Sequence, residues 1–218
     1  QNRVRQLVRT TEPYCVVGSP PCTPFSPLQE ISRSKRDAKV MDEQLRRGKA
    51  HIRFCLEIYA MQLSGKRHFI HEHPEKSRAW QLPEVMNLMT RPEVGSTVLH
   101  MCAFGMTATD KQGEGLVQKS TRVMSSSNEV LKRVSRRCTN EGNKERHRHV
   151  HLISGRAKAA QVYPRQLGQC ICEGIAAQKK ADQLGVRSRP IMSVDEMRKV
   201  VREKSGKAKI EECPSKSL

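Results

Sequence analysis

A short apolar run that stops at glycine and proline constrains this chain more than any other feature. Residues 14–17, Tyr-Cys-Val-Val, predict a short buried strand. Gly18 and the prolines after it end this strand abruptly, and Cys22 follows directly. Because open α/β sheets bind ligands at the carboxyl ends of their strands, we expect Cys22 in a rigid loop at such an edge. The alternative is a proline-rich turn with an incidental buried cysteine.

The rest of the chain alternates short strands with helices. Apolar residues at three- and four-residue spacing, such as Ile52, Leu56 and Tyr59, predict one long helix. The expected strands are residues 14–17, 68–71, 97–103 and 148–153, and the expected helices are 35–63, 82–89, 128–137 and one beginning at Pro164. Residues 107–127 lack periodicity and are expected to form an extended loop. This alternation favours an α/β sheet covered by helices.

The length of 218 residues fits one domain with an appended tail. We expect the domain at residues 1–180 and a charged, partly disordered linker or tail at 181–218. The eight cysteines are widely spread, which favours a reducing, intracellular compartment over a disulfide framework. No apolar run is long enough to span a bilayer, so no membrane association is expected. The chain begins with Gln1, so we expect a piece of a longer product.

The charge of the chain favours a polyanionic partner. It has 40 Lys and Arg against 22 Asp and Glu, for a net charge of +18. Such an excess points to nucleic acid rather than to a particular fold. Residues 132–158 contain nine basic and two acidic residues, a patch that would bind phosphates without reading sequence. A solvated basic loop explains the same composition.

A carboxylate marks the end of the second expected strand. Glu72 lies in Phe69-Ile70-His71-Glu72-His73-Pro74, just before a proline. If the first two strands are parallel and joined by the long helix, their carboxyl ends share one edge of the sheet. Cys22 and Glu72 would then face one crevice, as a nucleophile and an acid.

Two segments resemble the cytosine-5 DNA methyltransferases. Residues 18–26, GSPPCTPFS, are similar to the Pro-Cys nucleophile loop of that family, and residues 69–74, FIHEHP, are similar to its Glu-Asn-Val motif. The resemblance implies a Rossmann-like parallel sheet with flanking helices. It also implies that Cys22 attacks carbon 6 of a flipped cytosine while Glu72 contacts nitrogen 3 and the exocyclic amine. S-adenosylmethionine would supply the methyl group to carbon 5.

A third segment is similar to the family's base-contacting strand. Residues 117–124 place Lys119 and Arg122 where the family has arginines. Residues 159–167 are similar to the entry of the last helix in phage-like members, and the whole arrangement resembles methyltransferase-like segments of retroelement polyproteins. The expected nucleic-acid contacts, with DNA favoured and the nucleus a candidate location, are Lys119, Arg122, Arg146, Arg148 and Arg156.

The sequence lacks the family's cofactor-binding loop and differs from it in two motifs. No segment supplies the Phe-x-Gly-x-Gly loop that binds S-adenosylmethionine, Glu-Asn-Val has become Glu72-His73-Pro74, and Thr23 replaces a glutamine. We therefore expect an incomplete fold without its N-terminal cofactor-binding half, and no binding of S-adenosylmethionine by this chain alone. Two alternatives to an enzyme stay open: a non-catalytic nucleic-acid-binding segment and a degenerate retroelement product. Replacing Cys22 by serine would separate the enzyme from the binder.

A metal site is the chemical alternative. His147, His149 and His151 alternate, and Cys138 is near them in sequence. Cys170 and Cys172, however, are too close together for the cysteine pairs of structural zinc sites. We therefore expect a basic strand edge with interspersed histidines and no metal site.

Overall fold

The computed structural model describes the chain except for residues 28, 30–35, 141–146, 153–155, 157 and 186–218. The α-helices of this described part are α1 (Asn2–Thr11), α3 (Ala38–Ser64), α4 (Pro83–Met89), α5 (Asn128–Val134) and α6 (Arg165–Gln183). Its strands are β1 (Cys15–Gly18), β2 (His68–Pro74), β3 (Gly95–His100), β4 (Thr107–Asp110), β5 (Gly113–Leu116) and β6 (Ser120–Ser125). The short 3-10 helices of the same described part are η1 (Thr23–Phe25), η3 (Arg78–Gln81), η4 (Met101–Phe104) and η5 (Ala159–Gln161).

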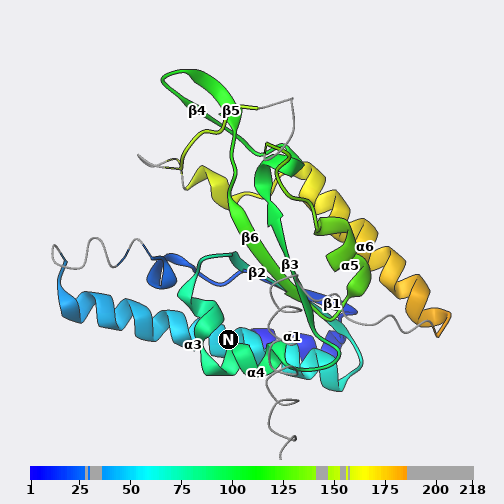
Figure 1. Ribbon diagram of the computed structural model, residues 1–218. Coiled ribbons are helices and arrows are strands. Elements are labelled where there is room, and N and C mark those ends of the chain that lie inside the picture. The colour runs from blue at the N-terminus through cyan, green and yellow to red at the C-terminus, as the bar shows by residue number, and fades with distance from the viewer. Residues whose placement is uncertain (28, 30–35, 141–146, 153–155, 157, 186–218) are drawn as a thin grey trace, which may run out of the picture.

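The main sheet is mixed, with strand order β1-β2-β6-β3. β1 and β2 pair in parallel, while β6 is antiparallel to both β2 and β3. β1, β2 and β3 therefore run in the same direction and end at one edge. The fold is α/β as expected, but the prediction of a parallel sheet was wrong because β6 enters between β2 and β3 in the opposite direction. β4 and β5 form a separate hairpin that projects beyond this edge (Figure 1).

Helices cover both faces of the sheet (Figure 1). Successive side chains of a strand point to opposite faces, and β2 shows this directly. Phe69 packs with the buried Tyr59 and Trp80 on the α3 and α4 face. Ile70 packs with Leu131 and other apolar side chains on the α5 and α6 face. The fold thus has a central sheet between two helical layers, each with its own core.

Most of the predicted elements are confirmed. The expected strands 14–17, 68–71 and 97–103 fall on β1, β2 and β3, and the expected helices fall on α3, α4, α5 and α6. α6 runs on to Gln183, and the remainder of the predicted tail, from residue 186, lies outside the described residues.

Two further sequence predictions were wrong. The stretch 107–127 holds β4, β5 and β6 instead of an extended loop. The expected strand at 148–153 is only an isolated bridge between Leu116 and His149. Pairing stops there because β5 ends at Leu116, and the next amide, that of Val117, donates instead to the Met106 carbonyl at 2.8 Å.

The contact between α5 and α6 depends on the absence of a side chain at Gly174. A Cβ there would lie 2.7 Å from the Cα of Val130, so the two helices would have to separate. We expect Gly174→Ala to lower the free energy of unfolding by about 1–3 kcal/mol. Gly168→Ala on the same helix is the matched control: its Cβ meets nothing within 4 Å, and the better helix propensity should raise stability by about 0.5–1 kcal/mol. Urea unfolding of both variants checks the pair, and equal effects would contradict the packing argument.

Candidate active site

Cys22 lies where the sequence places it, in the loop after β1. It precedes η1, and the amide of Phe25 donates to its carbonyl at 3.0 Å. Phe25 is buried and anchors the loop in the core beside α3. The strand can enter this loop only because residue 18 is glycine, since a Cβ there would lie 2.0 Å from the Tyr59 hydroxyl oxygen. Cys22 itself is half-buried.

Glu72 is buried in β2, on the face that α6 covers. Its Oε2 accepts a hydrogen bond from the Tyr163 hydroxyl at 3.1 Å. The Ser19 and Tyr163 hydroxyl oxygens are 2.5 Å apart. Because the Tyr163 proton points to Glu72, Ser19 is the donor in that pair. A chain of hydroxyls therefore runs from the Cys22 loop to one oxygen of the carboxylate.

The other carboxylate oxygen, Oε1 of Glu72, is buried and has no hydrogen-bond partner among the described residues. A buried acceptor without a donor costs about 1–3 kcal/mol, and more when it carries charge. Natural structures rarely keep such an atom unless a ligand or another group satisfies it. Oε1 is therefore the atom of this site with an unfilled requirement for a donor.

Lys119 brings a positive charge to the same place. It directly precedes β6, whose start lies at the edge where β1 and β2 end. Its Nζ donates to the Ala160 carbonyl at 3.1 Å. Burial raises the pKa of the Cys22 thiol, the charge of Lys119 opposes this rise, and the Glu72 carboxylate adds to it. Three predicted site residues, Cys22, Glu72 and Lys119, thus act on one another electrostatically.

Two buried histidines, which sequence reasoning passed over, lie on the opposite face of β2. His71 Nδ1 and the Tyr59 hydroxyl oxygen are 2.9 Å apart, whereas neither ring nitrogen of His73 has a partner among the described residues. The His73 ring contacts Phe25 edge-on, with centroids 6.0 Å apart. Burial lowers the pKa of His71 to about 3 and of His73 to about 4, so both rings are neutral at physiological pH. His73 therefore packs against Phe25, the buried side chain that holds the Cys22 loop in the core.

Tyr163 is the other residue of the site without a predicted role. It stands directly before Pro164, in the segment whose resemblance to a family helix was the only signal in the sequence. Its contact with Glu72 depends on how the segment between η5 and α6 packs against the sheet. The spacing of residues along the chain does not predict that packing.

The four predicted arginine contacts do not form one cluster with Cys22. Arg122 lies over the Trp80 ring, 5.5 Å from its centroid, on the α3 face. Arg148 is paired with both carboxylate oxygens of Asp110 at 2.8 and 2.9 Å. Arg156 donates to the His151 carbonyl, and Arg146 lies outside the described residues. Their role in nucleic-acid binding stays a prediction.

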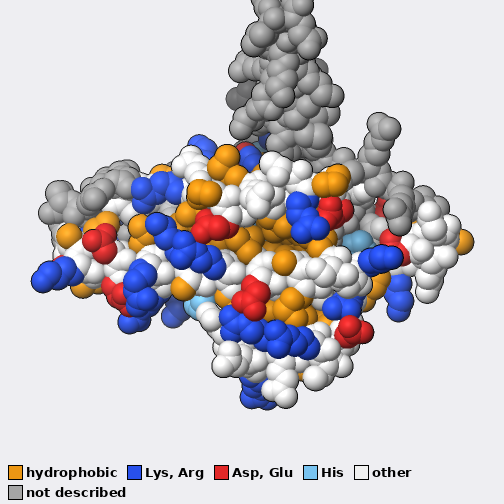
Figure 2. Space-filling model, turned by 90° about the horizontal axis from the view of Figure 1, so that it is seen from below, with side chains coloured by type: hydrophobic (Ala, Val, Ile, Leu, Met, Phe, Trp, Pro, Cys, Tyr) orange, Lys and Arg blue, Asp and Glu red, His pale blue; other side chains and the backbone are white. Residues whose placement is uncertain are grey.

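The face made by α1, α3 and α4 shows how the positive charge is distributed. Figure 2 shows basic side chains scattered over this face, with acidic and apolar side chains between them. Several are held in local ion pairs, such as Arg46 and Arg47 with Glu43 at 2.6 Å and Arg53 with Glu84 at 2.8 Å. This face therefore carries a dispersed charge and not a single basic groove.

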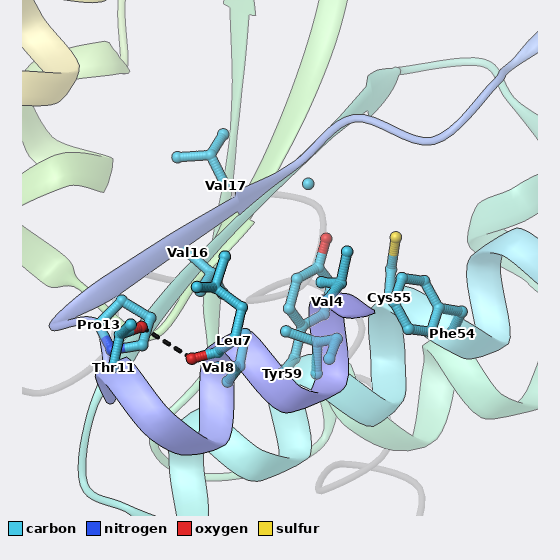
Figure 3. Close-up of a pocket in the computed structure, with 12 residues that line it drawn as sticks. Val4, Leu7, Val8, Thr11, Pro13, Val16, Val17, Phe54, Cys55 and Tyr59 are labelled. Carbon is cyan, nitrogen blue, oxygen red and sulfur yellow. Dashed lines mark hydrogen bonds between the residues drawn. The ribbon is translucent and has the colours of Figure 1, made fainter. Parts of the chain in front are cut away.

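The free edge of β1 is the natural place to look for an S-adenosylmethionine site. A cavity of about 370 Å³ opens there between α1, β1 and α3, and Figure 3 shows its lining. None of the lining residues is charged, and the hydroxyl of one of them, Thr11, donates to the Leu7 carbonyl at 2.8 Å. Nucleoside cofactors need a carboxylate or similar acceptor for the ribose hydroxyls, and buried charged groups need partners. The residues at this edge do not fit S-adenosylmethionine.

Comparisons of the chain with protein-family models, with curated proteins and with solved structures find no match. Among the described helices, none is both long enough and apolar enough to cross a membrane.

Proposed function

We propose that the Cys22–Glu72 site handles a cytosine base of nucleic acid, as the base-activating part of a cytosine-5 methyltransferase-like protein. The single observation that carries the proposal is the buried Oε1 of Glu72, which lacks a donor among the described residues and belongs to a carboxylate that acts electrostatically on the half-buried Cys22. Cys22 is the nucleophile and adds to carbon 6 of the ring. Glu72 holds nitrogen 3 and the exocyclic amine.

The hydrogen-bond donors of the cytosine edge match the Oε1 atom of Glu72, which has no donor among the described residues. The exocyclic amine of cytosine is a donor, and nitrogen 3 becomes one when it is protonated. Uracil and thymine present a carbonyl oxygen where cytosine has the amine, and that oxygen would face the Oε1 acceptor without a proton between them. Such a mismatch leaves a buried polar group unpaired, which is a strong basis for discrimination. The carboxylate therefore selects cytosine over the other pyrimidines.

Binding of the base would also activate the thiol. The Glu72 carboxylate contributes to the raised pKa of Cys22, whereas Lys119 counteracts it. Donors on the base compensate the negative charge of Glu72 and so weaken its effect on the thiol. The thiolate is the reactive form, so Cys22 becomes nucleophilic when a base is present. This coupling protects the free protein from unproductive reaction of its cysteine.

The reaction that the chain's own residues support is reversible addition to the ring. The Cys22 sulfur bonds to carbon 6, carbon 5 takes a proton from solvent, and the ring becomes a 5,6-dihydro adduct. Loss of the original hydrogen from carbon 5 and cleavage of the sulfur–carbon bond then restore cytosine and the thiol. S-adenosylmethionine would supply a methyl group to carbon 5 when bound, although the residues that line the cavity at the β1 edge do not fit it.

The substrate must present an extruded base. A base inside a duplex hides carbon 6 from the thiol, and flipping it out costs a few kcal/mol. The net charge of +18 supplies the attraction to phosphates that partly offsets this cost. Single-stranded nucleic acid avoids the flipping cost and is the better first substrate.

Exchange of hydrogen at carbon 5 tests this proposal without a cofactor. Oligonucleotides with tritium at carbon 5 of cytosine, as single-stranded DNA and RNA, are incubated with the full chain. We expect tritium to pass into water, and prior alkylation of the cysteines to stop it. Binding without exchange would contradict the proposal and favour the non-catalytic nucleic-acid-binding segment.

A further inference from the structure

Four potential metal ligands meet at the carboxyl end of β3. Cys102 lies in η4 directly after this strand, and Cys138 follows α5. His149 forms the isolated bridge with Leu116 of β5, and His147 lies two residues before it. One ligand atom from each lies within 4.8 Å of all the others. Nothing in the proposed chemistry of Cys22 uses them. We propose that Cys102, Cys138, His147 and His149 form a structural zinc site.

The distances among Cys138, His147 and His149 match three corners of a tetrahedral centre, and Cys102 Sγ lies within 4.8 Å of all three. The Sγ atom of Cys138 lies 3.5 Å from Nε2 of His147 and 3.5 Å from Nε2 of His149. With Zn–S at about 2.3 Å and Zn–N at about 2.0–2.1 Å, a tetrahedron requires a sulfur–nitrogen edge of about 3.5 Å. The two Nε2 atoms are 2.8 Å apart, and the same tetrahedron requires about 3.3 Å, a difference that small rotations of the rings supply. The side chains already converge on one point.

Contacts outside the cluster fix these ligands in place. Asn140 clamps the backbone of His147: its Oδ1 accepts from the His147 amide at 3.0 Å, and its Nδ2 donates to the His147 carbonyl at 2.8 Å. The amide of Cys138 donates to Nδ1 of His100 at 2.9 Å. Val150 donates to the Leu116 carbonyl at 2.7 Å, which holds the His149 segment against β5. Such supporting bonds are typical of a site built to hold a metal.

The donor set selects zinc. Two thiolates and two imidazoles in a tetrahedron are the ligands of structural zinc, whereas magnesium and calcium prefer oxygen. All four positions are protein side chains, so no position is open for a reacting water. The site is therefore structural and not catalytic.

The zinc would tie three distant segments together. It joins the end of β3, the segment after α5 and the segment beside the β4–β5 hairpin. This junction adjoins the candidate active site, because the amide of Met101, next to Cys102, donates to the Lys119 carbonyl at 3.1 Å. The sequence pattern contained Cys138, His147 and His149, but Cys102 belongs to another strand end and completes the set only through the fold. His151, Cys170 and Cys172, which share that pattern, are not part of the cluster.

Metal analysis of the full chain tests the site. Expressed with zinc and dialysed against metal-free buffer, the chain should retain one zinc ion. Cys138→Ser and His149→Ala should each lower the retained zinc at least about tenfold, because even residues that only orient ligands have effects of this size. His151→Ala and Cys172→Ser are matched controls that should retain it. Full retention in Cys138→Ser, or equal loss in His151→Ala, would overturn the assignment.

A spectroscopic measurement on the unaltered chain covers the case in which a variant fails to fold. Cobalt(II) replacing zinc should give the intense visible bands of a tetrahedral ion and a sulfur-to-cobalt charge-transfer band in the near ultraviolet. A chain that is folded by circular dichroism but binds neither zinc nor cobalt would refute the site. Bound iron with acid-labile sulfide would refute zinc as the metal.

Discussion

Replacing Cys22 by serine is expected to abolish hydrogen exchange at carbon 5 of cytosine. A serine hydroxyl keeps its proton at neutral pH and adds far less readily than a thiolate, so the exchange rate should fall by about 10⁴-fold or more. Glu72→Gln should lower the rate by about 10²–10⁴-fold, because the amide cannot carry the charge that stabilises a protonated nitrogen 3. The release of tritium from cytosine-labelled oligonucleotides measures both effects.

Matched controls separate loss of chemistry from loss of folding. Cys172→Ser removes an exposed cysteine of α6 and should leave exchange unchanged. Glu75→Gln alters a half-buried carboxylate at the same sheet edge, where it accepts from Ser120, and should change exchange by less than about tenfold. Thermal unfolding of all four variants checks that each is folded. Full activity in Glu72→Gln would show that this carboxylate is not the base-holding group.

Acidification below about pH 6.5 is expected to destabilise the protein steeply. The pKa of His71 is lowered from 6.5 to about 3 and that of His73 from 6.5 to about 4, in both cases mainly by burial. Above pH 6.5 these rings are neutral in both the folded and the unfolded chain, so their stabilising contribution is complete. Between 6.5 and the folded pKa values, the unfolded chain binds protons that the folded chain excludes, and stability falls with pH.

The expected loss of stability follows from the number of protons that the unfolded chain binds and the folded chain excludes. Two excluded protons correspond to a slope of about 2.7 kcal/mol per pH unit, which amounts to about 4 kcal/mol at pH 5. This is a large part of the stability of a typical domain, about 5–15 kcal/mol. His73→Phe keeps a ring between Phe25 and Trp80, removes two unpaired nitrogens and should reduce the slope by one proton.

Urea unfolding at several pH values between 4 and 7.5 measures this slope. The difference between the unaltered chain and His73→Phe isolates the buried histidine from other acid-sensitive groups, including any zinc ligands. An identical slope in the two proteins would show that His73 titrates normally and is accessible to protons in the folded state.

The sequence predicted those parts of the fold that depend on local signals. β1 is an apolar run closed by Gly18, and α3 carries an apolar stripe with Asp37 accepting from the Lys39 amide at its start. A long helix between two short strands is compatible with parallel pairing, which the sequence argument took as a condition and which β1 and β2 show. Parallel pairing in turn predicts that Cys22 and Glu72 lie at one edge of the sheet, since both follow or end strands that run in the same direction.

The remaining features depend on contacts between distant segments. β6 contains Ser120, Thr121 and Arg122, and such polar residues give no apolar signal even though the strand lies inside the sheet. α1 was not predicted because only Val8 of this helix is buried and its other residues are mostly charged or polar. Tyr163 lies far along the chain from Glu72 and contacts it only because the segment before α6 folds back onto the sheet. Cys102 is likewise distant in sequence from Cys138, His147 and His149, and only the fold brings the four together.

Identification of the cysteine that bonds to the base tests the central claim most directly. An oligonucleotide in which 5-azacytosine replaces cytosine is suitable, because it keeps the exocyclic amine that Glu72 contacts while its ring nitrogen at position 5 makes carbon 6 more electrophilic. The full chain is incubated with this oligonucleotide and digested, and the peptides are read by mass spectrometry. We predict that the modified base is bonded to Cys22 alone, and that Cys22→Ser yields no adduct. An adduct spread over exposed cysteines such as Cys172, or none with a folded and nucleic-acid-bound chain, would contradict the account.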